Sequence, residues 1–215
     1  MSDNKYYFVM LIIKNGEFKL HLKLEDVKEE DRGKLAPCGI LCIGCDTYVG
    51  ESIEAAKKLV EIWESWNMKD TGPMLGLDLE GIEVTLKTLK TFIKSGKRGP
   101  CPGCYIGGVA AQICGIAKCV KSKGFWTCAE CEDYDPDSET PCPHDEQSPI
   151  PVGNKKNMMK MMCARYSRNT TENLKRCLEI GYDAFLKEAE EKVANGWRTW
   201  QIISDEMIFT NSMKR

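Results

Sequence analysis

The spacing of apolar residues divides the chain into a short extended N-terminal part and a longer helical part. Apolar residues run without a break over residues 6–13, and they alternate with Lys and His over residues 18–24. The Asn15-Gly16 pair lies between these segments and favours a tight turn, because both turn positions need a positive φ. We therefore expect an N-terminal β-hairpin whose second strand leaves His21 on its solvent side.

Later in the chain, apolar residues recur at the spacing of amphipathic helices. The expected helices cover residues 52–66, 79–94, 109–121, 154–165 and 171–194. A last segment, residues 197–209, fits either helix or strand, and glycine, proline and cysteine interrupt most of residues 97–150. The predicted fold class is α+β, with an N-terminal β-hairpin, a mostly helical body and an irregular cysteine-rich region that metal ions hold together.

Three parts are expected along the chain. Residues 1–34 form a hairpin extension, residues 35–150 a cysteine-rich metal-binding domain, and residues 151–215 a C-terminal helical region. A chain of 215 residues is long enough to bury a hydrophobic core beside any metal site. Metal is therefore not expected to be its only source of stability.

Cysteine spacing carries the main chemical signal of the sequence. The chain has 12 cysteines, and ten of them form close-set groups between residues 38 and 142. Short separations let two thiolates face one ion, whereas a disulfide across so short a loop is strained and removes little chain entropy. We predict that these ten residues are metal ligands: Cys38, Cys42, Cys45, Cys101, Cys104, Cys114, Cys119, Cys128, Cys131 and Cys142.

The N-terminal residues and the net charge indicate the cellular compartment of the protein and bear on whether it binds nucleic acid. The first residues are polar, no secretory cleavage site follows, and the apolar run at residues 6–13 is too short to cross a bilayer. We expect a cytoplasmic protein with reduced thiols and no membrane contact. A net charge of −2 also gives no general attraction to nucleic acid.

Ten thiols suffice for two four-ligand metal centres. One predicted centre is a structural zinc ion that is bound by two Cys-x2-Cys knuckles, Cys101/Cys104 and Cys128/Cys131. The triplet Cys38, Cys42 and Cys45 needs a fourth ligand, for which the candidates are Cys114, Cys119, Cys142 and His144. Zinc is slightly favoured, and a [4Fe-4S] cluster is the alternative, because proline follows Cys101 and Cys142 as it often follows cluster ligands.

Two other cysteine chemistries receive less support from the sequence. The triplet spacing also occurs in radical S-adenosylmethionine enzymes, but no strand–helix repeats follow it to build their barrel. A nucleophilic cysteine activated by Lys118, Lys121 or Lys123 lacks a paired histidine. No catalytic motif is recognised, and whether the chain is an enzyme stays open.

The cysteine groups form an ordered series of motifs: Pro37-Cys-Gly-Ile-Leu-Cys-Ile-Gly-Cys45, Cys101-Pro-Gly-Cys104, Cys114-Gly-Ile-Ala-Lys-Cys119, Lys123-Gly124 and Cys128-Ala-Glu-Cys-Glu-Asp-Tyr134. This series resembles the cysteine-rich domain-of-unknown-function family 3795 of bacteria and archaea. The resemblance covers about residues 36–145 and implies a metal-binding module, frequent in anaerobes, without an established reaction. Cys142 is the least direct match, since the acidic residues 135–140 separate it from Cys131.

The remaining features separate the possible functions. Cys163 and Cys177 lie outside the motifs, and lone helical cysteines are expected as small buried hydrophobes. A structural or protein-interaction role is expected first, with a protein partner or a second copy meeting the N-terminal hairpin. Electron transfer through an iron–sulfur cluster is the alternative. Nucleic-acid binding through the basic residues 155–176 is disfavoured, because the acidic residues 130–146 would repel phosphate.

Overall fold

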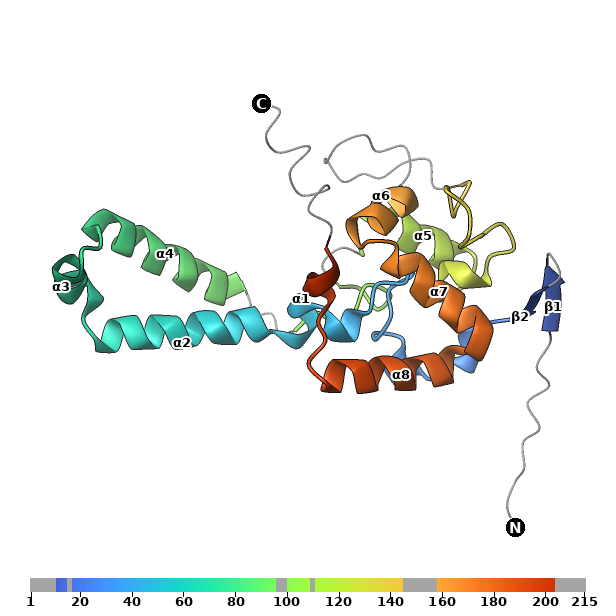
Figure 1. Cartoon of the computed structure of the whole chain (residues 1–215), viewed down its shortest axis with the longest axis horizontal. Coiled ribbons are helices and arrows are strands. Elements are labelled where there is room, and N and C mark those ends of the chain that lie inside the picture. The colour runs from blue at the N-terminus through green and yellow to red at the C-terminus, as the bar shows by residue number, and fades with distance from the viewer. Residues whose placement is uncertain (1–10, 15–16, 96–99, 109–110, 145–157, 204–215) are drawn as a thin grey trace, which may run out of the picture. The chain divides into compact units, whose positions relative to one another are not determined.

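A computed structural model describes residues 11–14, 17–95, 100–108, 111–144 and 158–203, with side chains from residue 20 onward. Its helices are α1 Asp46–Val49, α2 Glu51–Ser65, α3 Met68–Thr71, α4 Leu79–Ser95, α5 Gly115–Ser122, α6 Met158–Arg165, α7 Asn169–Ile180 and α8 Tyr182–Ala194 (Figure 1). Short 3-10 helices cover Leu24–Asp26, Glu29–Asp31, Cys42–Gly44, Gly72–Leu75, Cys128–Glu130 and Thr199–Ile202. Two strands, β1 Leu11–Lys14 and β2 Glu17–Leu20, complete the described elements.

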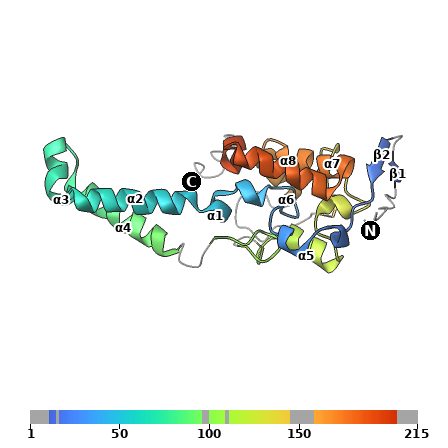
Figure 2. The same ribbon diagram turned by 90° about the horizontal axis from the view of Figure 1, so that it is seen from below.

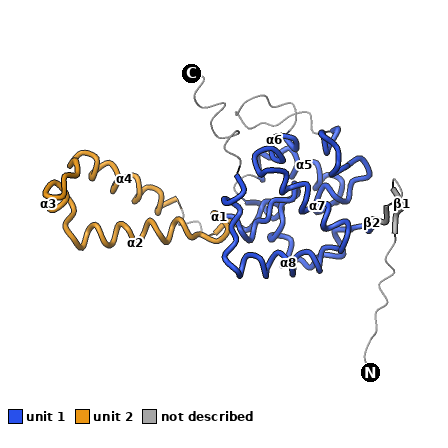
Figure 3. Tube along the Cα trace, viewed as in Figure 1, with its two compact units in different colours: residues 1–45, 102–215 blue, residues 46–101 orange. Residues whose placement is uncertain are grey.

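The chain forms two compact units whose boundaries differ from the expected division into three parts. Residues 1–45 and 102–215 form the first unit, and residues 46–101 form the second (Figure 3). The second unit is thus an insertion in the first. In sequence, it separates the triplet that ends at Cys45 from the motif that ends at Cys104.

The inserted unit is a pair of antiparallel helices. α2 and α4 run side by side in both views and are connected through α3 (Figures 1 and 2). The unit's core is a cluster of buried side chains from all three helices: Val60 of α2, Met68 of α3, and Ile82 and Leu86 of α4. Both helices match the sequence prediction closely, because each has one apolar stripe and the stripes face each other.

The helices of the larger unit depart more from the predicted boundaries. The single helix expected over residues 171–194 is two helices, because Gly181 adopts φ 83° and ψ 164°, which ends α7 and starts α8. The helix expected from residue 109 begins only at Gly115, after Cys114 in extended conformation. Residues 154–157 and 204–209 of two other predictions lie outside the described residues.

A fully buried tryptophan lies at the centre of the larger unit. Trp126 donates from its indole Nε1 to the Arg32 carbonyl oxygen at 3.0 Å. Its ring meets the ring of Tyr182 edge-on, with centroids 4.7 Å apart. This cluster joins the first residues of α8 to the segment that precedes the cysteine triplet. The N-terminal cysteine loop is therefore part of the core of this unit, not an appendage to it.

The predicted α+β class is wrong, because the described chain is essentially helical. Its paired strands are two four-residue segments in register from Leu11–Leu20 to Lys14–Glu17, and they build no sheet layer. The N-terminal hairpin is thus not a β component of the fold; its Asn15-Gly16 turn lies outside the described residues. The alternation at residues 18–24 predicted a strand over the whole segment, but β2 ends at Leu20. The side chain of Leu22 is instead buried in the helical unit, so tertiary packing and not strand pairing accounts for the apolar residue at this position. No helix in the part of the chain that the structure describes is both long and apolar enough to cross a bilayer.

The core of the inserted unit gives a direct test of its packing. Replacing Ile82 by Ala should lower the free energy of unfolding of this unit by about 2–5 kcal/mol, because it leaves a cavity between α2 and α4. The matched control is Val84→Ala on the exposed face of the same helix, for which about 0.5 kcal/mol or less is expected. Amide hydrogen exchange of α2 and α4 measures both effects, and equal protection in the two variants would contradict this packing.

Candidate metal centre

The first cysteine loop is held in place by the N-terminal turn of α7. Gly39 has φ 92°, and a Cβ atom there would lie only 2.1 Å from the Thr170 carbonyl oxygen. Asn173 Nδ2 also donates to the Gly39 carbonyl oxygen at 2.8 Å. Only glycine fits so close to another backbone. The neighbouring Cys38 and Cys42 are buried.

A second cysteine loop reaches the first through another close backbone contact. A Cβ atom on Gly103 would lie 2.0 Å from the Gly33 carbonyl oxygen, so this approach again requires glycine. Beside it, the Cys42 thiol donates a hydrogen bond to the Cys104 sulfur. This bond lowers the pKa of Cys104 to about 7, and it raises the pKa of Cys42 together with burial. The two residues therefore form a thiol–thiolate pair near neutral pH.

Cys38 lies within electrostatic range of several further thiols. Burial is the main cause that raises the pKa of Cys38, and repulsion from Cys114, Cys104 and Cys163 raises it further. The Cys114 thiol lies 3.6 Å from the Met158 sulfur at the start of α6. Four motif thiols thus form the first thiol set: Cys38, Cys42, Cys104 and Cys114.

The second thiol set surrounds Cys128. Burial raises the pKa of Cys128 most, and the thiols of Cys38, Cys142, Cys119 and Cys131 raise it further. The Cys128 N–H donates to the Pro37 carbonyl oxygen at 3.0 Å, which places this loop beside the first. Excluding Cys38, which belongs to the first set, four motif thiols form the second thiol set: Cys119, Cys128, Cys131 and Cys142.

A lysine stands beside the second thiol set. Lys123 Nζ donates to the Cys131 sulfur at 3.2 Å, and this bond raises the pKa of the lysine. Lys121, by contrast, lies over the Tyr105 ring at 5.2 Å. Of the three lysines that the sequence analysis considered, Lys123 is therefore the one with a described thiol contact.

The structure groups the motif cysteines differently from the two expected knuckles. Cys104 lies with Cys42, whereas Cys128 and Cys131 lie with Cys119 and Cys142. Cys101 is the last residue of the inserted unit, where its N–H donates to the Thr47 carbonyl oxygen at 2.8 Å. Cys45 belongs to the first unit. Burial is the main cause that raises the pKa of Tyr166, and the thiols of Cys38 and Cys45 raise it further. His144 is exposed and bonds to Asp133 at 2.7 Å.

The donor chemistry of both thiol sets fits a metal, although their present spacing is wider than coordination requires. No three Cys, His, Asp or Glu side chains of the described ranges lie close enough together to hold one ion. All 12 cysteines are free thiols. Protonated thiols have no charge to attract an ion, and metal binding displaces their protons. Four sulfur donors in each set match the ligand number of a tetrahedral thiolate site.

A buried carboxylate beside the second thiol set was missed by the sequence analysis. Glu130 belongs to the acidic residues 130–146, but its side chain is buried, and burial raises its pKa. Its Oε1 accepts hydrogen bonds from the Trp126 and Thr127 N–H groups at 2.7 and 3.0 Å and from the Tyr182 hydroxyl at 2.8 Å. The Thr127-x2-Glu130 capping box is the sequence signal that predicts this arrangement.

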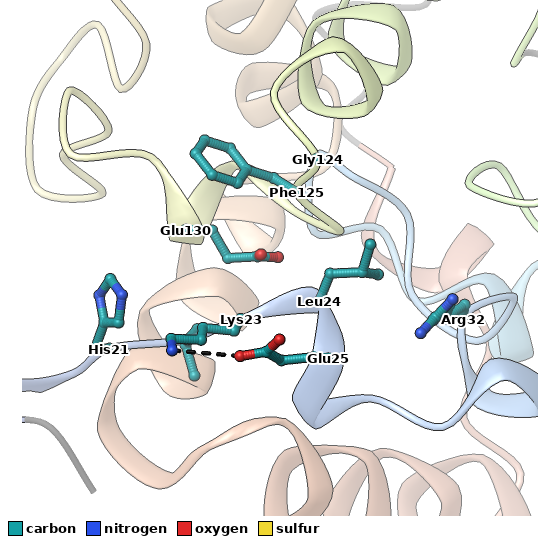
Figure 4. Close-up of a pocket in the computed structure, with 9 residues that line it drawn as sticks. His21, Lys23, Leu24, Glu25, Arg32, Gly124, Phe125 and Glu130 are labelled. Atoms are coloured by element: carbon teal, nitrogen blue, oxygen red, sulfur yellow. Dashed lines mark ion pairs between the residues drawn. The ribbon is translucent and has the colours of Figure 1, made fainter.

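Glu130 also lines a cavity of about 390 Å³ (Figure 4). Its side chain lies between Phe125 and Leu24, and His21 stands at the edge of the same cavity. His21 is half-buried there, where the sequence placed it on an open strand face.

Comparison with known proteins identifies one family over the cysteine-rich region. The model of a family described as "Protein of unknown function (DUF3795)" matches residues 34–142. All ten motif cysteines lie inside this range, whereas Cys163 and Cys177 lie outside it. No curated protein and no solved structure matches the chain.

The Glu130 network predicts a stability loss without any change of metal ligand. Tyr182→Phe removes one donor from Glu130 and one partner from Thr127, so the free energy of unfolding should fall by about 1–3 kcal/mol. The control is Tyr105→Phe, which keeps the ring next to Lys121 and should change stability by about 0.5 kcal/mol or less. Chemical denaturation measures both, and an unchanged Tyr182→Phe midpoint would show that the network adds nothing.

Proposed function

The chain belongs to the DUF3795 family, whose description names no activity, and on this premise we propose that it is a metal-binding protein with two thiolate centres. The first thiol set and the second thiol set supply four sulfur ligands each. The metal ions cross-link loops that are far apart in sequence. Their role is to fold the cysteine-rich region into a stable module for interaction with another protein.

The observation that carries this proposal is the Cys42–Cys104 contact. These residues belong to different motifs, yet their sulfurs share a hydrogen bond, and the pKa of Cys104 falls to about 7. Thiolates are the form that binds metal, so this pair has one ligand already prepared at neutral pH.

Zinc is the metal we propose for both centres. Four cysteine ligands in a closed, largely buried site are typical of structural zinc, and cysteines next to short turns supply N–H groups that orient the sulfurs. Cys42 and Cys128 each begin a 3-10 turn that fits this pattern. The alternative is a [4Fe-4S] cluster for electron transfer or for support of an anaerobic redox enzyme, which Pro102 and Pro143 after their cysteines support.

The inserted unit offers a surface for the protein partner. Apolar side chains are exposed around the end where α2 and α4 are connected, with Met74 at 85 % exposure. Exposed apolar groups in such number are typical of interaction sites. Trp66, Leu75, Leu77 and Leu79 share this part of the unit. The predicted alternative contact, through the N-terminal hairpin, concerns side chains outside the described residues and stays a prediction.

Nucleic-acid binding gains no support from the described basic residues. Lys175 pairs with Asp137 at 2.8 Å, and Arg176 pairs with Glu188 at 2.8 Å and with Glu179 at 3.0 Å. These cations are partly neutralised within the protein. We propose a cytoplasmic protein, in keeping with its free thiols and with the reducing conditions that metal–thiolate sites need.

Metal content of the full chain tests the proposal. Protein purified without oxygen should contain about two zinc ions per chain, and Cys42→Ser and Cys128→Ser should each remove about one. Elemental analysis measures the ratio, and a brown colour with iron in place of zinc would indicate the cluster alternative. Metal-free protein with its cysteines in disulfides would refute metal binding.

A further inference from the structure

The cavity that Glu130 lines belongs to neither thiol set. Its volume is about 390 Å³, and no cysteine is among the residues that line it. A volume of this size falls within the range of small-molecule pockets in proteins. Leu22, Leu24 and Phe125 give it apolar walls, and Figure 4 shows Phe125 and Leu24 on either side of the Glu130 carboxylate. The cavity therefore has the size and walls of a site for a small organic molecule.

Glu130 brings a buried negative charge to this cavity. The residue is 9 % exposed, and its three described hydrogen bonds, from Trp126, Thr127 and Tyr182, all reach Oε1. Bonds of this kind favour the charged carboxylate over the neutral acid. The three donors are themselves uncharged, and Glu130 forms no ion pair with a residue in the described ranges. Its charge therefore has no partner of opposite sign in the described part of the chain.

Arg32 brings a positive charge to the same cavity. One guanidinium nitrogen, Nη2, donates to the Val27 carbonyl oxygen at 3.3 Å, while Nε is buried with no hydrogen-bond partner among the described residues. Arg32 forms no ion pair within those residues, with Glu130 or with any other. Buried donors almost always have a partner, and the planar guanidinium is suited to bind a carboxylate. Arg32 therefore indicates an anionic group on the ligand.

The other charged side chains of the cavity stand at its rim. Lys23 and Glu25 pair with each other at 3.3 Å, and their side chains are 48 % and 75 % exposed. Water screens charges at such positions, and this pair carries no net charge. Glu130 and Arg32 consequently determine which charges a ligand must carry.

Two of the cysteine-region motifs contribute to the cavity. Gly124, from the Lys123-Gly124 motif, lines it with φ 74°, a conformation that favours glycine. This turn precedes Phe125 in the cavity wall. Glu130 comes from the Cys128-Ala-Glu-Cys131 motif, and both motifs lie inside the family match at residues 34–142. These motifs therefore carry residues that metal binding alone does not account for.

We propose that this cavity binds a free amino acid with an apolar side chain. The ammonium group of the ligand pairs with the Glu130 carboxylate, and its carboxylate pairs with the Arg32 guanidinium. Its side chain packs against Phe125 and Leu24. Such a zwitterion gives each of the two charges a partner of opposite sign and leaves the net charge of the cavity unchanged. This binding is separate from the thiol sets and goes beyond the proposed function.

Isothermal titration of the natural full chain with phenylalanine tests the proposal without any substitution. Two analogues each lack one charge, since phenethylamine has no carboxylate and hydrocinnamate has no ammonium group. Phenylalanine should bind about tenfold or more tightly than either analogue, because each analogue leaves one charged side chain without its partner. Equal affinity for phenylalanine and one of the analogues would overturn the proposal, as would the absence of binding by both phenylalanine and leucine.

Two charge-removing variants test the assigned residues. Glu130→Gln keeps an oxygen that accepts the three bonds of Oε1 but removes the charge, and it should weaken phenylalanine binding about tenfold or more. Arg32→Gln should weaken it by a similar factor. The matched controls Lys28→Gln and Glu29→Gln change exposed charges outside the cavity and should bind as the natural chain does. Full affinity in Glu130→Gln or Arg32→Gln would contradict the assignment, and where a variant does not fold, the analogue comparison decides.

Discussion

The backbone contact between Gly39 and Thr170 determines how the larger unit is assembled. It presses the first cysteine loop onto the N-terminal turn of α7, and Asn173 holds it there by a second bond. The Cys128 loop then attaches to the same loop through Pro37. The Thr170 hydroxyl also donates to the Cys163 sulfur at 3.1 Å, so three distant stretches of sequence are joined at one turn of helix. A side chain at position 39 would separate them.

The energetics of these thiols follow from their burial. A thiolate is costly in an apolar interior, so Cys38 and Cys128 stay protonated without a counter-charge. Among the described residues, Lys123 Nζ lies 3.2 Å from the Cys131 sulfur, and the hydrogen bond from Cys42 lowers the pKa of Cys104 to about 7. In the proposed function, a divalent cation in each centre supplies the missing charge for its four thiolates. Metal binding and folding of this region are therefore coupled in the proposed function.

Sequence patterns predicted the parts of this protein that depend on local periodicity or local spacing. The helices at residues 51–65 and 79–95 and the family match are of this kind. Alternation at residues 18–24 predicted a strand face, but tertiary burial of Leu22 ended the strand early. The burial of Glu130 and the contact of Cys104 with Cys42 were not predicted. Both depend on which distant segments meet, and the spacing within a motif carries no information about that.

The two ends of the inserted unit meet in space. The Cys101 N–H donates to the Thr47 carbonyl oxygen at 2.8 Å, close to where the chain enters and leaves the α2–α4 pair. Because the two ends of the insertion are close together, the larger unit needs only a short connection between residues 45 and 102. The insertion therefore adds little loop-closure entropy to the folding of the larger unit. Length and sequence between these ends are free to vary at little cost to the thiol region. The insertion is thus an exchangeable module, and its recognition surface is separable from the chemistry of the cysteines.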